Sequence, residues 1–180
     1  MSRDTAIAPA RVSPIVAACN GAGVPCVVDS HGPAVIQALA EKPFILKATQ
    51  EEMAESGLGS RGGDPLSMAR AAVEHGAEAC IVTLGARGAV ACVGPGRAKG
   101  AAQECWRLTV PRQNAINAVG AGDAFTAGLV VALATSASFQ DALVQAGAAG
   151  AASVLQLGAG HLDPVKVREL APLVHVRRAA

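Results

Sequence analysis

The residues NAVGAGDAF at positions 117–125 have the types and spacing of a turn that binds an anion. Gly120, Ala121 and Gly122 precede a helical pattern, so their small size lets backbone N–H groups approach a ligand closely. The helix N-terminus adds a partial positive charge that favours a phosphate. Asp123 is either an ordinary first-turn carboxylate that offsets the helix dipole or a base that accepts a proton from an attacking hydroxyl. The spacing matches neither the Walker A loop nor the dinucleotide fingerprint.

A second glycine-containing turn, TLGARG at positions 83–88, follows the most apolar predicted strand. Ligands of open α/β sheets bind at the carboxyl ends of strands, so Thr83, Gly85 and Gly88 are candidates for contact with a ligand. The alternative is a plain tight turn that the two glycines permit.

The segment LKATQEE at positions 46–52 places two charged side chains next to the end of another predicted strand. Lys47 would supply a cation for a phosphate, and Glu52 an acid for a hydrated metal ion. The alternative is a solvated strand end followed by an ordinary carboxylate at a helix start.

The elements that must position these residues alternate along the chain. Short β-branched or apolar runs predict strands over 24–29, 43–47, 78–85, 88–94 and 105–110. Helical periodicity and end signals predict helices over 12–22, 33–41, 64–76, 122–135, 138–156 and 163–174. This alternation predicts an α/β fold with a largely parallel sheet, in a single domain.

Composition excludes several classes of protein. Of the 180 residues, 51% are apolar and 16% charged, with a net charge of +1, which argues against a long disordered chain and a broad nucleic-acid surface. Aromatic residues make up only 2%, which nearly rules out stacking platforms for nucleic acids or sugars.

The cysteines and the apolar segments indicate a compartment. Five cysteines without C-x-x-C spacing are expected to be small buried hydrophobic residues in a reducing cytosol. The N-terminus carries no apolar run of a signal peptide, and the most apolar helical stretch, 124–134, is too short to span a bilayer. We therefore expect a soluble, cytoplasmic protein.

Read in order, four segments resemble the motifs of the ribokinase-like carbohydrate kinases, in the branch that includes phosphofructokinase B, 1-phosphofructokinase and tagatose-6-phosphate kinase. VVDSHGPAVIQAL resembles a strand, an Asp-Ser/Thr-x-Gly turn and a helix; LKATQEE resembles Lys-Pro-Asn-x-x-Glu; VTLGARGAV resembles the Ser-Leu-Gly-x-x-Gly nucleotide turn; and NAVGAGDAFTAGLVVAL resembles the Asn-Thr-Val-Gly-Ala-Gly-Asp signature. The Ala-rich tail is similar to the family's helix beside adenine.

The resemblance implies a three-layer ribokinase-like fold, ATP and Mg²⁺ as cofactors, and phosphoryl transfer to a hydroxyl of a fructose- or tagatose-type sugar phosphate. Asp123 would match the catalytic base, and the N–H groups of Gly120, Ala121 and Gly122 the anion hole. The remaining matches are Thr83, Gly85 and Gly88 along the ATP phosphates and ribose, Lys47 and Thr49 in the nucleotide network, and Glu52 at the Mg²⁺ ion and its waters.

Three departures from the family qualify these expectations: two changes in the motifs and the length of the chain. Ala48-Thr49 replaces the motif's Pro-Asn, and Ala118 replaces the signature's Thr. Members of the family are nearly twice as long, and their first half supplies most sugar-binding residues and a β lid. We therefore expect residues 1–180 to be a single ATP-binding C-terminal portion, truncated before the sugar site, with one sheet edge exposed.

The expected partners are a sugar phosphate and either a second copy or a complementing N-terminal half, with no nucleic acid and no membrane. Two alternatives stay open: a catalytically inactive fragment that binds nucleotide or dimerises, and a plain α/β scaffold whose glycine turns are only turns.

Overall fold

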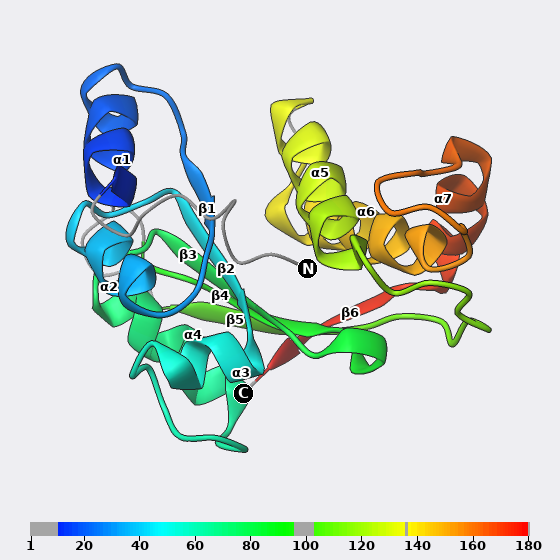
Figure 1. Ribbon diagram of the computed structural model, residues 1–180, viewed down its shortest axis with the longest axis horizontal. Helices are drawn as coiled ribbons and strands as arrows, with labels where there is room; N and C mark the ends of the chain where they lie inside the picture. Colours follow the sequence, from blue (N-terminus) through cyan, green and yellow to red (C-terminus); the bar gives the residue numbers. More distant parts are fainter. Residues whose placement is uncertain (1–10, 96–102, 136, 180) are drawn as a thin grey trace. The chain divides into compact units, whose positions relative to one another are not determined.

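The computed structural model describes residues 11–95, 103–135 and 137–179, and in them an α/β architecture (Figure 1). Six strands hydrogen-bond in the order β1-β2-β3-β4-β5-β6. The strands are β1 (Val27–Asp29), β2 (Ile45–Thr49), β3 (Ala79–Thr83), β4 (Ala89–Val93), β5 (Glu104–Thr109) and β6 (His175–Ala179). The helices are α1 (Val12–Gly21), α2 (Pro33–Ala40), α3 (Gln50–Glu55), α4 (Pro65–Glu74), α5 (Ala121–Ala134), α6 (Phe139–Ser153) and α7 (Pro164–Leu170). The predicted fold class is confirmed.

The sheet combines parallel pairing with a hairpin. β1 and β2 are parallel, with Asp29 opposite Lys47 in the register. β3 and β4 are neighbours joined only by residues 84–88, which is too short for a parallel crossover and makes the pair an antiparallel hairpin. β1 ends the strand order, so one of its edges has no strand partner among the described residues.

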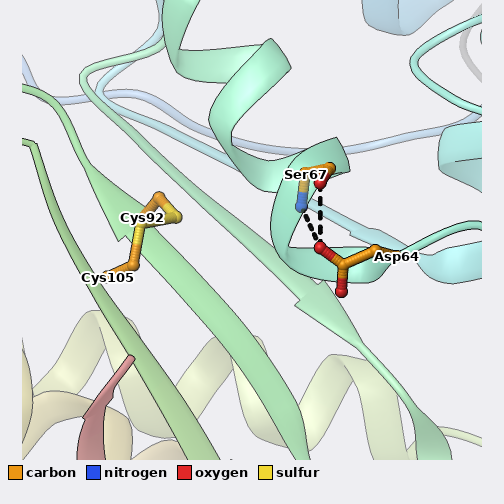
Figure 2. The surroundings of a disulfide bond; sticks show 4 residues. All are labelled: Asp64, Ser67, Cys92 and Cys105. Atoms are coloured by element: carbon orange, nitrogen blue, oxygen red, sulfur yellow. Dashed lines mark hydrogen bonds between the residues drawn. A yellow bond between two sulfur atoms is a disulfide. The ribbon is translucent and has the colours of Figure 1, made fainter. Parts of the chain in front are cut away.

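The chain divides into two compact units. The first comprises residues up to Val82 and the segment Ala91–Cys105, and the second comprises Thr83–Val90 and the residues from Trp106 onward. In the first unit, the apolar faces of β2 and β3 are fully buried, which explains their nearly continuous apolar sequence. Asp64 caps α4 by accepting the N–H of Ser67 at 3.0 Å, as its position before Pro65 predicts (Figure 2).

The second unit is built around the contact between α5 and α6, which lie side by side in Figure 1. A Cβ added to Gly128 of α5 would lie 2.8 Å from the Cβ of Ala149 and 3.0 Å from the carbonyl oxygen of Gln145, both on α6. The helices therefore approach to a distance that only glycine permits at this position. Trp106, the only tryptophan, packs against Phe139 with ring centroids 5.6 Å apart.

Sequence patterns missed β6 and misplaced the end of α7. β6 was not predicted, because its five residues include His175, Arg177 and Arg178 and lack a continuous apolar run. The predicted helix over 163–174 instead ends as α7 at Leu170 and continues as a 3₁₀ turn, after which the chain enters the strand.

The expectation that the cysteines stay unpaired is wrong for two of the five. Cys92 on β4 and Cys105 on β5 form a disulfide between neighbouring strands, with Cα atoms 4.1 Å apart (Figure 2). The pairing follows from the strand register, which places both residues at one level of the sheet. Cys80 is fully buried as expected, whereas Cys19 and Cys26 are half-buried free thiols.

Gly128→Ala is expected to lower the free energy of unfolding by about 1–2 kcal/mol, because overpacking of the α5–α6 contact outweighs the gain in helix propensity. Urea unfolding followed by Trp106 fluorescence measures this. Gly150→Ala on α6 is the matched control, since its new Cβ would meet nothing closer than the Ala121 carbonyl oxygen at 3.3 Å. A Gly128→Ala protein as stable as the Gly150→Ala protein would contradict the argument.

Candidate active site

The turn before α5 is held in place by one side chain, Asn117. Its Oδ1 accepts the N–H of Val119 at 2.9 Å, and its Nδ2 donates to the carbonyl oxygen of Leu157 at 3.0 Å. The N–H of Asn117 also donates to the carbonyl oxygen of Val154 at 3.1 Å. The turn is therefore tied to the segment that follows α6. An asparagine side chain that bonds the backbone two residues later is a common turn device.

Gly120 makes the transition from this turn into α5. Its φ of +84° lies in the left-handed region, and a Cβ there would lie 3.2 Å from the backbone nitrogen of Gly160. Both constraints favour glycine. The helix that follows has 14 residues, long enough for its dipole to act at the N-terminus.

The first turn of α5 presents donors and one carboxylate. The N–H groups of Gly122 and Asp123 have no acceptor within the helix, because they belong to its first turn. The N–H of Ala121 is already engaged by the carbonyl oxygen of Ala118 at a long 3.3 Å. Asp123 is exposed, and its carboxylate makes no hydrogen bond or ion pair with the residues that the structure describes. The first-turn N–H groups can bind an anion, and the Asp123 carboxylate next to them can accept a proton.

The turn at 83–88 is closed by its own backbone. Gly88 accepts the N–H of Leu84 at 2.8 Å and donates its own N–H to Gly85 at 3.0 Å. Gly88 is buried with φ +94°, and a Cβ there would lie 2.1 Å from the Leu108 carbonyl oxygen of β5. Gly85 is exposed, and Thr83 ends β3 half-buried. The turn thus has one glycine packed against the sheet and one facing solvent.

Lys47 is the third of the five residues of β2 rather than the last residue of a strand as predicted, and it pairs with an acid to which the sequence analysis gave no role. Its Nζ donates to Asp29 Oδ2 at 2.7 Å, and the two side chains are 5% and 33% exposed. The parallel register places Asp29 of β1 directly opposite Lys47. The pair holds the ammonium group beside the last residue of β1, and a charged hydrogen bond of this kind contributes about 1.5–3 kcal/mol. The sequence feature that could have indicated this pair is the aspartate of the Asp-Ser-His-Gly segment, residues 29–32.

Thr49 and Glu52 form a capping box at the start of α3. Thr49 Oγ1 accepts the N–H of Glu52 at 3.2 Å, and Glu52 Oε2 accepts the N–H of Thr49 at 2.7 Å. The interpretation of Glu52 as a helix-start carboxylate therefore describes its contacts. The role of Glu52 at a metal ion and the role of Thr49 at a nucleotide remain predictions.

The residues fit a magnesium ion that arrives with a nucleotide. No group of three or more His, Cys, Asp or Glu side chains among the described residues is arranged to hold a metal by itself. Mg²⁺ typically keeps several waters and takes one or two protein carboxylates together with substrate phosphates. Glu52 is half-buried, and its Oε1 is not used in the capping box, so it suits this role.

The predicted residues are divided between the two units. The first unit contains Lys47 and Thr49 on β2 and Glu52 in the first turn of α3. The second unit contains the remainder: Thr83, Gly85, Gly88, Gly120, Ala121, Gly122 and Asp123. Sequence reasoning missed Asp29 and Asn117 as positioning side chains, although both lie inside segments that it had quoted.

The chain belongs to the pfkB family of carbohydrate kinases, whose model matches residues 6–166. A 1-phosphofructokinase from Bacillus subtilis is 28% identical over 173 residues, covering 91% of this chain and 52% of that protein. The chain therefore spans about half the length of this curated relative.

Solved structures show the same fold. Phosphofructokinase-2 from Escherichia coli superimposes with a TM-score of 0.79 at 24% identity, over 93% of this chain and 53% of that one. Ribokinase from Arabidopsis thaliana, complexed with ribose and ATP, gives a TM-score of 0.75 at 24% identity, over 92% of this chain and 53% of that one. The ribokinase-like fold is thus confirmed. None of the described helices has the length and apolarity needed to cross a bilayer.

Gly88→Ala is expected to lower the free energy of unfolding by at least about 2 kcal/mol, because it adds backbone strain to a collision with the Leu108 carbonyl. Gly85→Ala, at φ +60° but in open space, should lose only about 1 kcal/mol. Urea unfolding with the nearby Trp106 as the fluorescent reporter compares the two. Equal losses would show that the close approach to β5 does not constrain the turn.

Proposed function

We propose that this chain is the ATP-binding portion of an ATP-dependent kinase that phosphorylates a hydroxyl group of a fructose- or tagatose-type sugar phosphate. The observation that carries the proposal is the start of α5, where first-turn N–H donors lie beside an exposed carboxylate with no described partner. Membership of the pfkB family supports it, as does the likeness to a 1-phosphofructokinase.

In this proposal, α5 acts on the reacting phosphoryl group. Asp123 accepts the proton of the sugar hydroxyl as its oxygen attacks the γ-phosphorus, and the bond between that phosphorus and the ADP oxygen breaks. The N–H groups around Gly120, Ala121 and Gly122 stabilise the negative charge on the transferring oxygens. Because Ala121 already donates weakly to Ala118, Gly122 and the helix dipole carry more of this work.

The other residues bind and orient the nucleotide. Thr83, Gly85 and Gly88 line the ATP phosphates and ribose, and Lys47 and Thr49 belong to the phosphate network. Glu52 orients the waters of Mg²⁺, an ion that neutralises phosphate charge when it is bound with ATP. The ion pair with Asp29 holds the Lys47 ammonium in one place, so Lys47 acts as a fixed charge rather than a mobile arm.

A second candidate function is a catalytically inactive fragment that binds nucleotide or dimerises. It is favoured by Ala48, Thr49 and Ala118, which replace the residues of the family's motifs. A second copy or a complementing N-terminal half is then the partner. Since the proposed reaction consumes ATP, we propose the cytoplasm as the compartment.

The chain is expected to bind MgATP, and Asp123→Asn should change its dissociation constant by less than about threefold, because the base contacts the acceptor hydroxyl rather than the nucleotide. Isothermal titration calorimetry with MgATP measures both proteins. The absence of any binding heat or saturation would remove both nucleotide functions and leave the plain scaffold.

Phosphoryl transfer by residues 1–180 is expected only when they are joined to the half of the curated relative that they do not span. A chimera that joins the unmatched half of the Bacillus subtilis 1-phosphofructokinase to this chain should release ADP with fructose 1-phosphate, fructose 6-phosphate or tagatose 6-phosphate. Asp123→Asn in the chimera should lower kcat by about 10²–10⁴-fold, the usual contribution of a general base. A folded, MgATP-binding chimera without ADP release would favour the inactive fragment, and unchanged kcat in the variant would remove Asp123 as the base.

A further inference from the structure

One side of α5 is apolar and open to solvent. Because an α-helix has about 3.6 residues per turn, five residues of α5 lie on the same side of it: Asp123, Ala127, Val130, Val131 and Ala134. All five are exposed, Val130 by 42% and Val131 by 65%. We call these five residues the outer face of α5. It carries Asp123 at its N-terminal end and apolar side chains along the rest of its length.

The opposite side of α5 packs inside the second unit. Phe125, Leu129 and Ala132 are buried there, next to the close contact of α5 with α6. A helix at a protein surface normally carries charged residues on its solvent side, and a helix that is apolar all round is normally buried. Asp123 is the only charged residue of α5. Its sequence is therefore that of a helix covered on both sides, whereas its outer face is open among the described residues.

The relatives of this chain have a further half that is a candidate cover for the outer face. The matches span 52% of the 1-phosphofructokinase from Bacillus subtilis and 53% of phosphofructokinase-2 from Escherichia coli, so about half of each relative lies outside them. Ligand sites form preferentially where two domains meet. A chain that packed on Val130 and Val131 would have its rim at Asp123, where the proposed reaction needs an acceptor hydroxyl.

A second copy of this chain fits the outer face less well. Two α5 helices that packed outer face against outer face would bury the Asp123 carboxylate against a helix without Lys, Arg or His. Burial of a carboxylate without a partner is costly. The same contact would also cover Asp123 on its exposed side, from which an acceptor hydroxyl must approach.

We propose that the outer face of α5 is the docking surface for a chain equivalent to the half of the curated relative that residues 1–180 do not span, and that the acceptor sugar phosphate binds where this contact meets Asp123. The inference rests on the proposed function, in which Asp123 accepts the proton of the sugar hydroxyl. Burial of the apolar side chains of the outer face supplies binding free energy. The same contact excludes water from the hydroxyl beside Asp123.

The test measures how fast a cysteine placed on the outer face reacts with iodoacetamide. Val131→Cys and its matched control, Val165→Cys on α7, where the valine is 50% exposed, are made in residues 1–180 and in the chimera with the unmatched half of the Bacillus subtilis protein. The reagent labels the native protein for graded times, and an isotope-labelled form then fills the remaining thiols after denaturation. Mass spectrometry reads the tryptic peptide 113–166, which contains no cysteine of its own.

In residues 1–180, the two introduced thiols are expected to react at rates within about threefold of each other, because both positions are open. In the chimera, the thiol at position 131 should react at least about tenfold more slowly than the thiol at position 165. The buried Cys80, which should stay unlabelled, reports that the chimera is folded. Equal labelling of the two positions in a folded chimera would overturn the proposal.

The labelling of residues 1–180 alone is decisive without any chimera. A thiol at position 131 that reacts slowly and becomes faster on dilution would assign the outer face to a second copy. A slow thiol at every concentration would show that the face is already covered within the chain. Either result would overturn the proposal.

A charge on the outer face gives an independent measurement. Val131→Asp should leave the urea midpoint of residues 1–180 close to that of the unaltered chain but lower the midpoint of the chimera, where the carboxylate would be buried without a partner. Val165→Asp, the matched control, should lower neither. An equal loss from Val131→Asp in both proteins would contradict docking at this face.

ADP release by the chimera separates this inference from the proposed function. Slow labelling at position 131 without ADP release would support the docking surface and count against the kinase function. ADP release with fast labelling at position 131 would support the kinase function and overturn the docking surface.

Discussion

Close approach of one backbone segment to another is the constraint on which the second unit depends. Gly88 faces the Leu108 carbonyl of β5, Gly128 faces α6, and Gly120 lies against Gly160. A site made from backbone N–H groups needs such contacts, because the peptide units themselves must reach the ligand. The scarcity of aromatic residues therefore has a second meaning besides the lack of a stacking platform: the chain uses small residues where its elements pack closely. Alanine and glycine are what lets α5, α6 and the two turns come as near as they do.

Elements whose signals are local could be predicted from the sequence. α4 begins at Pro65 after its cap Asp64, and α7 begins at Pro164 after its cap Asp163, as their capping patterns indicate. β6 could not be predicted, because a charged five-residue segment becomes a strand only where β5 offers it an edge. The bond between Cys92 and Cys105 could not be predicted either, since it depends on the register of β4 against β5.

The same division holds for the candidate site. Motif order located the glycine turns and the start of α5, but it did not reveal what the side chains contact. Lys47 was expected to face a phosphate as a single cation, whereas it is paired with Asp29 across a parallel register. The side chain of Asn117 donates a hydrogen bond to the carbonyl oxygen of Leu157, 40 residues later in the sequence. These partners depend on the tertiary fold, and a local sequence pattern carries no information about it.

The disulfide between β4 and β5 has a topological consequence. The chain leaves the second unit after Val90, contributes Ala91–Cys105 to the first, and returns at Trp106. Cys92 and Cys105 lie next to these two crossing points, so their bond turns the excursion into a covalent ring. A protease that cuts a single peptide bond inside the ring leaves the polypeptide in one piece. The halves on either side of such a nick separate only in the presence of a reductant.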